Sequence, residues 1–233
     1  MKKVMKAVAA LMLMTAVVFA AGCQKTDDTN NGDNNDADPQ NHHEYVDLGL
    51  PSGTLWATCN VGADTPEAYG NFFAWGETKT KKEFNWGTYT LCNGNSDSFT
   101  KYTYSDGLTV LEPIDDAATA NWGDKWCMPS TLQLEELFEK ASYKWTKQNG
   151  VCGVLFTANN GKSLFLPAAG SGYDCGTGPA GECGVYWANS LDPNSDVIAM
   201  RMSFVNDAEG FRIGMGSNRR RYGFSIRPVR STE

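Results

Sequence analysis

The sequence predicts a compact α+β domain with short antiparallel strands, long loops and one or two helices. Its 24 Gly and 9 Pro favour many turns over long helices. Its 7 Trp, 9 Tyr and 11 Phe favour a β-rich core with aromatic side chains left over for surfaces. Residues 45–233 are enough for a single domain of ordinary size, and no linker divides them.

Residues 1–22 predict a signal peptide. A start with three lysines is followed by an uncharged apolar run from Ala7 to Ala21, which is too short for a membrane span. The segment that ends in Gly22-Cys23 resembles the lipobox of bacterial lipoproteins, in which the cysteine is acylated. We therefore expect lipidation at Cys23 and an anchor in the lipid bilayer. Simple secretion is the alternative.

Residues 23–44 predict a disordered acidic tether after the lipidated cysteine. Beyond Cys23 they contain one Lys, six acidic residues and no large apolar side chain, so they cannot bury enough surface to offset the entropy of ordering. The run Gln24 to Asp28 resembles the export signal that sends lipoproteins of the Bacteroidetes to the outer face of the outer membrane. We expect this cell-surface location; a solvated spacer is the alternative.

The charge of the remaining chain argues against nucleic acid as a partner. Residues 45–233 keep 16 of the 20 basic residues and 21 of the 27 acidic residues, so the domain is acidic. Contacts with phosphates dominate nucleic-acid affinity, and they require the opposite balance.

The clearest helix follows Pro129. Ser130 and Gln133 form a capping box, and the apolar residues Leu134, Leu137, Phe138 and Ala141 recur at helical spacing. A shorter helix is expected from Asp115-Asp116 through Asn121, because carboxylates accept the free N–H groups of a helix start.

Short strands are expected where aromatic and β-branched residues lie between turns, and residues 76–114 are expected to form a long loop region. Residues 197–204 show the best alternation of apolar and other side chains. The predicted strands are 54–58, 71–75, 151–157, 163–167, 185–189, 197–204 and 222–229.

Six cysteines beyond Cys23 predict disulfides, because an even number in an exported chain is typical of a bridged domain. About 15 connectivities are open in principle. Neighbourhood in the sequence favours the pairs Cys59–Cys92, Cys127–Cys152 and Cys175–Cys183.

The chemistry-bearing residues do not predict an enzyme. His42 and His43 both lie in the predicted tether, which removes histidine bases and histidine metal sites from the domain. No CxxC or CxxH spacing and no phosphate-binding glycine motif is present, so we expect no metal and no cofactor.

Several stretches together resemble a known family, and they cover nearly all of residues 45–230. They are the segments 46–62, Phe73-Ala-Trp-Gly-Glu77, 115–122, Trp126-Cys-Met-Pro129, Leu166-Pro-Ala-Ala-Gly170, Val185-Tyr-Trp-Ala-Asn-Ser190 and Gly223-Phe-Ser-Ile-Arg-Pro-Val229. They resemble the Fibrobacter succinogenes major paralogous domain family of Bacteroidetes lipoproteins. The resemblance implies a C-type-lectin-like domain, whose ends are joined by paired strands and which serves ligand binding.

Two departures from the family bear on the disulfides. Cys127 stands where the family more often has Arg, and Cys152 stands where a polar residue is usual. Because the two departures occur together, they support the pair 127–152.

The resemblance places a binding face in the loops between the late strands, at residues 171–222. If residues 197–204 pair with 222–229, the 206–221 loop lies beside the 190–196 loop. Asp192-Pro-Asn194 and Asn206-Asp207 are similar to calcium-binding and sugar-binding pairs of C-type lectins, although such residues are also ordinary turn formers. The expected ligand-binding residues are Asn189, Asp192, Asn194, Asn206, Asp207, Arg212, Asn218, Arg219 and Tyr222.

The segment Arg219-Arg220-Arg221 supplies planar donors for an acidic or sugar-like ligand, or it forms a solvated turn. Three functions follow: adhesion or recognition through a glycan or protein ligand, a structural subunit of an envelope assembly, and an enzyme of the formylglycine-generating fold. The enzyme is disfavoured because its chemistry needs paired reactive thiols, and these cysteines are expected to be committed to disulfides. An exposed aromatic patch near Trp187 would favour the first function, and a long unpaired sheet edge the second.

Overall fold

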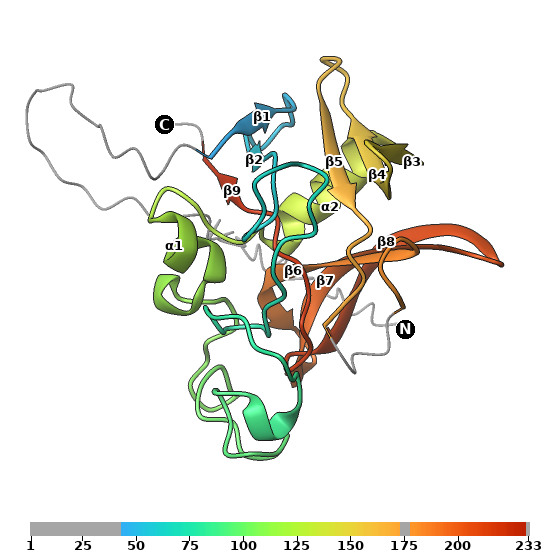
Figure 1. The fold of residues 1–233 in the computed structure, drawn as a ribbon. Coiled ribbons are helices and arrows are strands. Elements are labelled where there is room, and N and C mark those ends of the chain that lie inside the picture. The colour runs from blue at the N-terminus through green and yellow to red at the C-terminus, as the bar shows by residue number, and fades with distance from the viewer. Residues whose placement is uncertain (1–42, 173–177, 232–233) are drawn as a thin grey trace, which may run out of the picture.

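Three small antiparallel sheets and two short helices make up the part of the chain that the computed structural model describes, residues 43–172 and 178–231 (Figure 1). The protein is therefore mostly β, with long connections between the sheets. Each sheet has three strands, which pair in the following order. They are β1 (Tyr45–Asp47), β2 (Leu55–Ala57) and β9 (Val229–Arg230); β3 (Ser142–Gln148), β4 (Val151–Thr157) and β5 (Ser163–Pro167); β6 (Cys183–Asp192), β7 (Ser195–Asp207) and β8 (Gly210–Arg219).

Both predicted helices are present, and their caps explain where they begin. In α2 (Thr131–Lys140), the Ser130 side chain accepts from the backbone N–H of Gln133 and the Gln133 side chain accepts from the N–H of Ser130. In α1 (Ala117–Trp122), the carboxylate of Asp116 accepts from the first free N–H groups. Two short 3-10 turns, η1 (Trp86–Thr88) and η2 (Pro113–Asp115), lie in the long connection before α1.

Two apolar clusters form the core. One lies between α2, the β3–β4–β5 sheet and one face of the β6–β7–β8 sheet, and it contains Leu134, Leu137, Met202 and Phe204. The other fills the space between the long loops and the start of the third sheet, around Trp75. The loop region 76–114 thus packs its aromatic side chains into a core that it shares with α1 and the third sheet, which explains how so many polar residues fold without regular strands.

The predicted strands 151–157 and 163–167 are confirmed as β4 and β5, and 185–189 and 197–204 lie within the longer β6 and β7. Residues 54–58 form only the three-residue β2. Two predictions are wrong. Residues 71–75 contribute one bridge, Phe73 to Phe224, instead of a strand.

The second wrong strand is 222–229, of which only β9 at its end is a strand. Its backbone bonds go to separate segments: the N–H of Phe224 donates to Phe73, and that of Ser225 donates to Val185. Before Val229 the segment is mostly buried and forms only isolated bridges to other segments. Consequently β7 pairs with β6 and β8, and not with 222–229.

None of the three predicted disulfides is present. Cys59, Cys92, Cys152 and Cys183 are free thiols, and Cys175, the predicted partner of Cys183, lies outside the described residues.

The position of each thiol in the folded chain depends on tertiary packing, so neighbourhood in the sequence does not predict which cysteines meet. Buried Cys92 donates its S–H to the carbonyls of Trp86 and Tyr89. Cys127 is disulfide-bonded, but Cys152 in β4 is a free thiol and is therefore not its partner. The backbone of Cys127 is hydrogen-bonded to that of Val229.

The folded chain begins before residue 45. The imidazole of His43 stacks on the indole of Trp122, with 3.5 Å between ring centroids, and the carbonyl of Glu44 accepts from the N–H of Thr58. The described part of the domain therefore contains one histidine, His43, where the sequence predicts none. The predicted signal peptide, Cys23 and His42 lie outside the described residues. No helix in the described ranges is long and apolar enough to cross a membrane.

Candidate functional site

The β6–β7–β8 sheet has one closed face and one partly uncovered face. Side chains alternate between the two faces of a strand, and directly paired residues share a face. Met202 and Phe204 of β7 point toward α2 and the second sheet, where they are fully buried. Arg201, which precedes Met202, and Ser203, which follows it, point to the other face.

Loops close only part of this other face. Trp187 of β6, which pairs with Arg201, is fully buried, and its indole N–H donates to the carbonyl of Phe73 at 2.9 Å. Toward β8 the same face carries half-exposed polar residues and glycines. We call this part the open face and define it by five residues: Arg201, Ser203, Gly214, Gly216 and Asn218.

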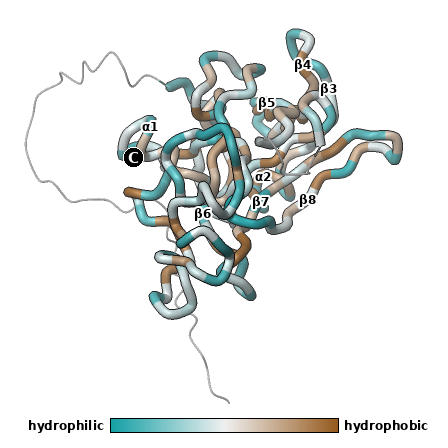
Figure 2. Tube along the Cα trace, turned by 60° about the horizontal axis from the view of Figure 1, so that its bottom comes forward, coloured by the Kyte–Doolittle hydropathy of each residue, from teal (hydrophilic) through white to brown (hydrophobic). Residues whose placement is uncertain are grey.

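Two glycines make the open face flat. A Cβ at Gly214, opposite Ser203, would meet nothing within 4 Å. A Cβ at Gly216 would lie 3.4 Å from Cζ of Arg201, so the guanidinium lies over the space that this glycine leaves. The far end of the β7–β8 hairpin projects from the body of the molecule (Figures 1 and 2), and its closed face packs against the second sheet through Phe211.

The guanidinium of Arg201 is half-buried and incompletely satisfied. Its Nη1 donates to the hydroxyl of Ser203. Its Nε is buried and has no hydrogen-bond partner. Within residues 43–172 and 178–231, no ion pair involves this side chain. Burial lowers the pKa of the Arg201 guanidinium, which reflects the cost of keeping its charge away from water.

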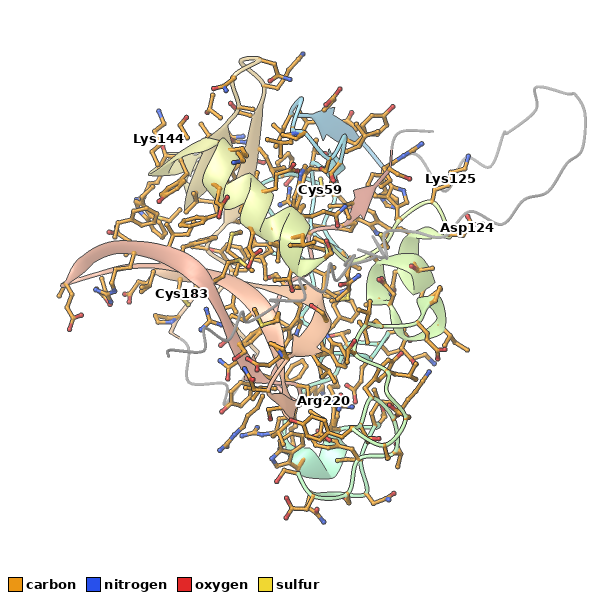
Figure 3. The ribbon with its side chains drawn as sticks, turned by 180° about the vertical axis from the view of Figure 1, so that it is seen from behind. Cys59, Asp124, Lys125, Lys144, Cys183 and Arg220 are labelled. Atoms are coloured by element: carbon orange, nitrogen blue, oxygen red, sulfur yellow. The ribbon has the colours of Figure 1, made fainter. Side chains whose placement is uncertain are left out.

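The three consecutive arginines do not form one cluster of donors. Arg219 is exposed at the end of β8, opposite Ile198. Arg220 is fully buried at the end of the sheet (Figure 3), and its four hydrogen bonds all go to its own chain. Arg221 donates to the carbonyl of Phe84 and lies over the ring of Tyr222 at 4.5 Å. The prediction that Arg220 supplies donors to a ligand is therefore wrong.

The nine expected ligand-binding residues do not lie on one face. The 206–221 segment is mostly β8 and not a loop, and the turns 193–194 and 208–209 lie at opposite ends of β7. That strand has 13 residues, so the two turns are about 40 Å apart. Asp192, Asn194, Asn218 and Arg219 lie toward one end, whereas Asn206, Asp207 and Arg212 lie toward the other.

The two remaining residues are at least partly inside the protein. Asn189 is 8% exposed, and its backbone N–H donates to Pro129. Tyr222 is half-buried and packs against the loop core. The side-chain oxygen of Asn189 is also buried and has no partner, so neither residue offers a free surface of the kind expected.

Local bonds occupy most of the predicted carboxylates and amides. Asp192 accepts from the N–H of Asn194, and Asn218 accepts from that of Arg219. The hydrogen bond from the Glu209 N–H, together with Arg212, lowers the pKa of Asp207. In the described part of the chain, no group of three or more His, Cys, Asp or Glu could hold a metal ion. The calcium-like pattern is therefore explained by turn formation.

Arg201 is not among the predicted site residues, although the sequence carries a signal for it. Arg201 is the one charged residue on the less apolar side of the 197–204 alternation, and Gly214 and Gly216 alternate in the strand that follows. Comparison with known proteins adds no relative to these observations: no family model, no curated protein and no solved structure matches the chain.

Proposed function

We propose that this chain is a cell-surface lipoprotein whose C-type-lectin-like domain recognises a ligand through the open face of the β6–β7–β8 sheet. The sheet of β1, β2 and β9 supports the lectin-like assignment, because paired strands join the two ends of the domain. Glycans and proteins are both candidate ligands. The role that follows is adhesion or recognition at the outer membrane.

One observation carries this proposal: the open face is polar, flat and not covered by the loops that close the rest of the same sheet face. Trp187 and Val185 are buried under those loops, whereas Gly214 looks onto empty space. A flat polar surface with bare backbone lets a ligand approach the sheet closely. Trp187 itself is fully buried, so it offers no stacking surface, and recognition at the open face depends on hydrogen bonds more than on stacking.

A blocking substitution tests this function. Gly214→Trp places a large side chain on the open face, at a position where a Cβ would meet nothing within 4 Å. The matched control is Lys144→Trp, which places the same side chain on exposed β3 of another sheet (Figure 3). On a glycan and protein array, we expect the first variant to lose the ligands of the wild type and the control to retain them. Equal binding by both variants would refute the role of the open face.

Anchoring is tested separately at Cys23. The Gly22-Cys23 junction has the small residues that lipoprotein processing requires. We expect Cys23→Ala to move the protein from the membrane fraction to the soluble fraction of cells. Unchanged retention in the membrane would contradict the lipoprotein assignment.

A structural role in an envelope assembly is the second candidate, and one observation favours it. β8 has ten residues and pairs only with β7 among the described strands, so its outer edge can accept another strand. Sedimentation of residues 43–233 over a hundredfold range of concentration tests this role. Ordered oligomers would support it, and a monomer throughout would exclude self-assembly through β8.

A further inference from the structure

We infer that the ligand of the open face carries a carboxylate, that Arg201 binds it, and that the carboxylate belongs to an acidic sugar of a glycan. This inference rests on the proposed function, since it names the ligand class of the same site. It begins from a charge that the described protein leaves without a counter-ion.

The missing counter-ion can be seen by comparing the arginines of this sheet face. Arg212 also points to this face, and its guanidinium is 2.7 Å from Asp207 and 3.1 Å from Glu209. Arg201 is more deeply buried and has no such pair; its one hydrogen bond goes to a neutral hydroxyl. A half-buried charge without a partner lowers the stability of the fold. The unpaired charge of Arg201 is therefore better explained by a ligand that it binds than by a role in folding.

The remaining donors of Arg201 fit a carboxylate. A guanidinium has five N–H groups in a planar fork that matches the two oxygens of a carboxylate. Nη1 uses one N–H on Ser203 and Nε is buried out of a ligand's reach, whereas Nη2 is neither bonded nor buried, so the donors left for a carboxylate lie on the two Nη atoms. Because the guanidinium lies over Gly216, no side chain from β8 stands between it and a ligand on this side.

The position of Arg201 favours a sugar over an extended peptide. A peptide that adds to this sheet would pair with the outer edge of β8. Arg201 lies on the central strand, about 5 Å further in, and on the face of the sheet. A ligand that reaches it must lie flat over Gly214 and Gly216, whose Cα atoms are about 7 Å apart. The bare backbone there accommodates a rigid ring, and Ser203 and Asn218 flank it with polar groups that suit sugar hydroxyls.

The test is an array of glycans that carry uronic or sialic acids, each printed beside a twin whose carboxylate is converted to the neutral amide. Neutral glycans and an oligo-glutamate peptide complete the array. We expect the wild-type protein to bind at least one acidic glycan and to lose its amide twin. We expect Arg201→Gln to weaken that binding roughly tenfold or more, because a charge-assisted bidentate contact is lost.

Two further variants separate recognition from structure. Arg212→Gln removes an ion-paired guanidinium from the same face, and we expect its affinity to stay within about twofold of the wild type. Arg201→Gln should unfold at an equal or higher urea concentration than the wild type, because it removes an uncompensated charge. A structural role for Arg201 would instead lower its stability and leave the selectivity between acid and amide unchanged.

Each other outcome is decisive. Binding of neutral glycans or of amide twins as strongly as acids would overturn the carboxylate inference and leave the proposed function standing. Binding of the oligo-glutamate peptide in place of every glycan would assign the site to acidic proteins and overturn the sugar assignment. Binding of nothing on either array would overturn the proposed function itself.

Discussion

Replacement of Arg220 by Met removes four hydrogen bonds from the interior of the protein. Nε donates to the hydroxyl of Tyr89 at 2.8 Å, Nη1 donates to the carbonyls of Tyr102 and Asp196 at 2.8 and 2.9 Å, and Nη2 donates to that of Lys101 at 2.7 Å. The guanidinium thereby ties the long loop region to the end of the third sheet.

The expected loss can be worked from these contacts. Met has a similar length and no donor, so four acceptors in a mostly buried setting lose their partner, at about 1–3 kcal/mol for each that water cannot reach. Removal of a buried charge offsets part of this cost. The cation also lies 4.2 Å from the ring centroid of Phe99, a contact that Met replaces only in part. We expect a net loss of about 3–5 kcal/mol in the free energy of unfolding.

Urea denaturation of residues 43–233, followed by tryptophan fluorescence, measures this loss. The control is Arg219→Met, at an exposed neighbour whose replacement should cost less than about 0.5 kcal/mol. Arg220→Lys should fall between the two, because one ammonium cannot reach all four acceptors. A loss below about 1 kcal/mol for Arg220→Met would show that the buried guanidinium does not hold the loops, and would refute the reasoning.

Three further predictions concern single buried groups. Asp116→Asn places an amide N–H against the N–H of Met128, which now donates to the carboxylate at 2.8 Å, so urea denaturation should show a loss of about 1–3 kcal/mol; an unchanged midpoint contradicts this. Burial raises the pKa of the Cys183 thiol to about 11, so iodoacetamide at pH 8.5 should alkylate it roughly 100-fold more slowly in the folded protein than in urea; equal rates count against burial. Burial lowers the pKa of the His43 imidazole, so the free energy of unfolding should fall as the pH drops below about 6.5. NMR should show a higher pKa for His43 in Trp122→Ala, and an unchanged value would exclude the stacking.

The elements that the sequence predicts well are those whose signals are local. The capping box of α2 and the turns around β4 and β5 lie within a few residues of the elements that they delimit. β8 was missed because Gly214 and Gly216 weaken its strand signature, although β7 supplies a partner for its whole length. Pairing with a neighbouring strand therefore decides the structure where the strand propensity of the segment itself is poor.

The candidate site was mislocated for a related reason. Residues that are neighbours in the sequence, such as Arg219, Arg220 and Arg221, point in different directions at the end of a strand. The open face instead joins β7 and β8 through their register, which depends on the hairpin turn at 208–209. Arg201 and Gly216 share a face because they are directly paired. The sequence predicts this neighbourhood only when residues 210–219 are recognised as a strand.

The small sheet of β1, β2 and β9 has a mechanical consequence. The described chain enters through β1 and leaves through β9, which flank β2 as immediate neighbours (Figure 1). Because only the width of β2 separates the entering strand from the leaving strand, about 10 Å, the domain can be inserted into a loop of another protein with little stretching of its host. A load applied at the entering end would act first on β1, whose three residues pair only with β2. β1 would then separate from β2 and lengthen the chain slightly, while the strands of the other two sheets, farther along the chain, stayed paired.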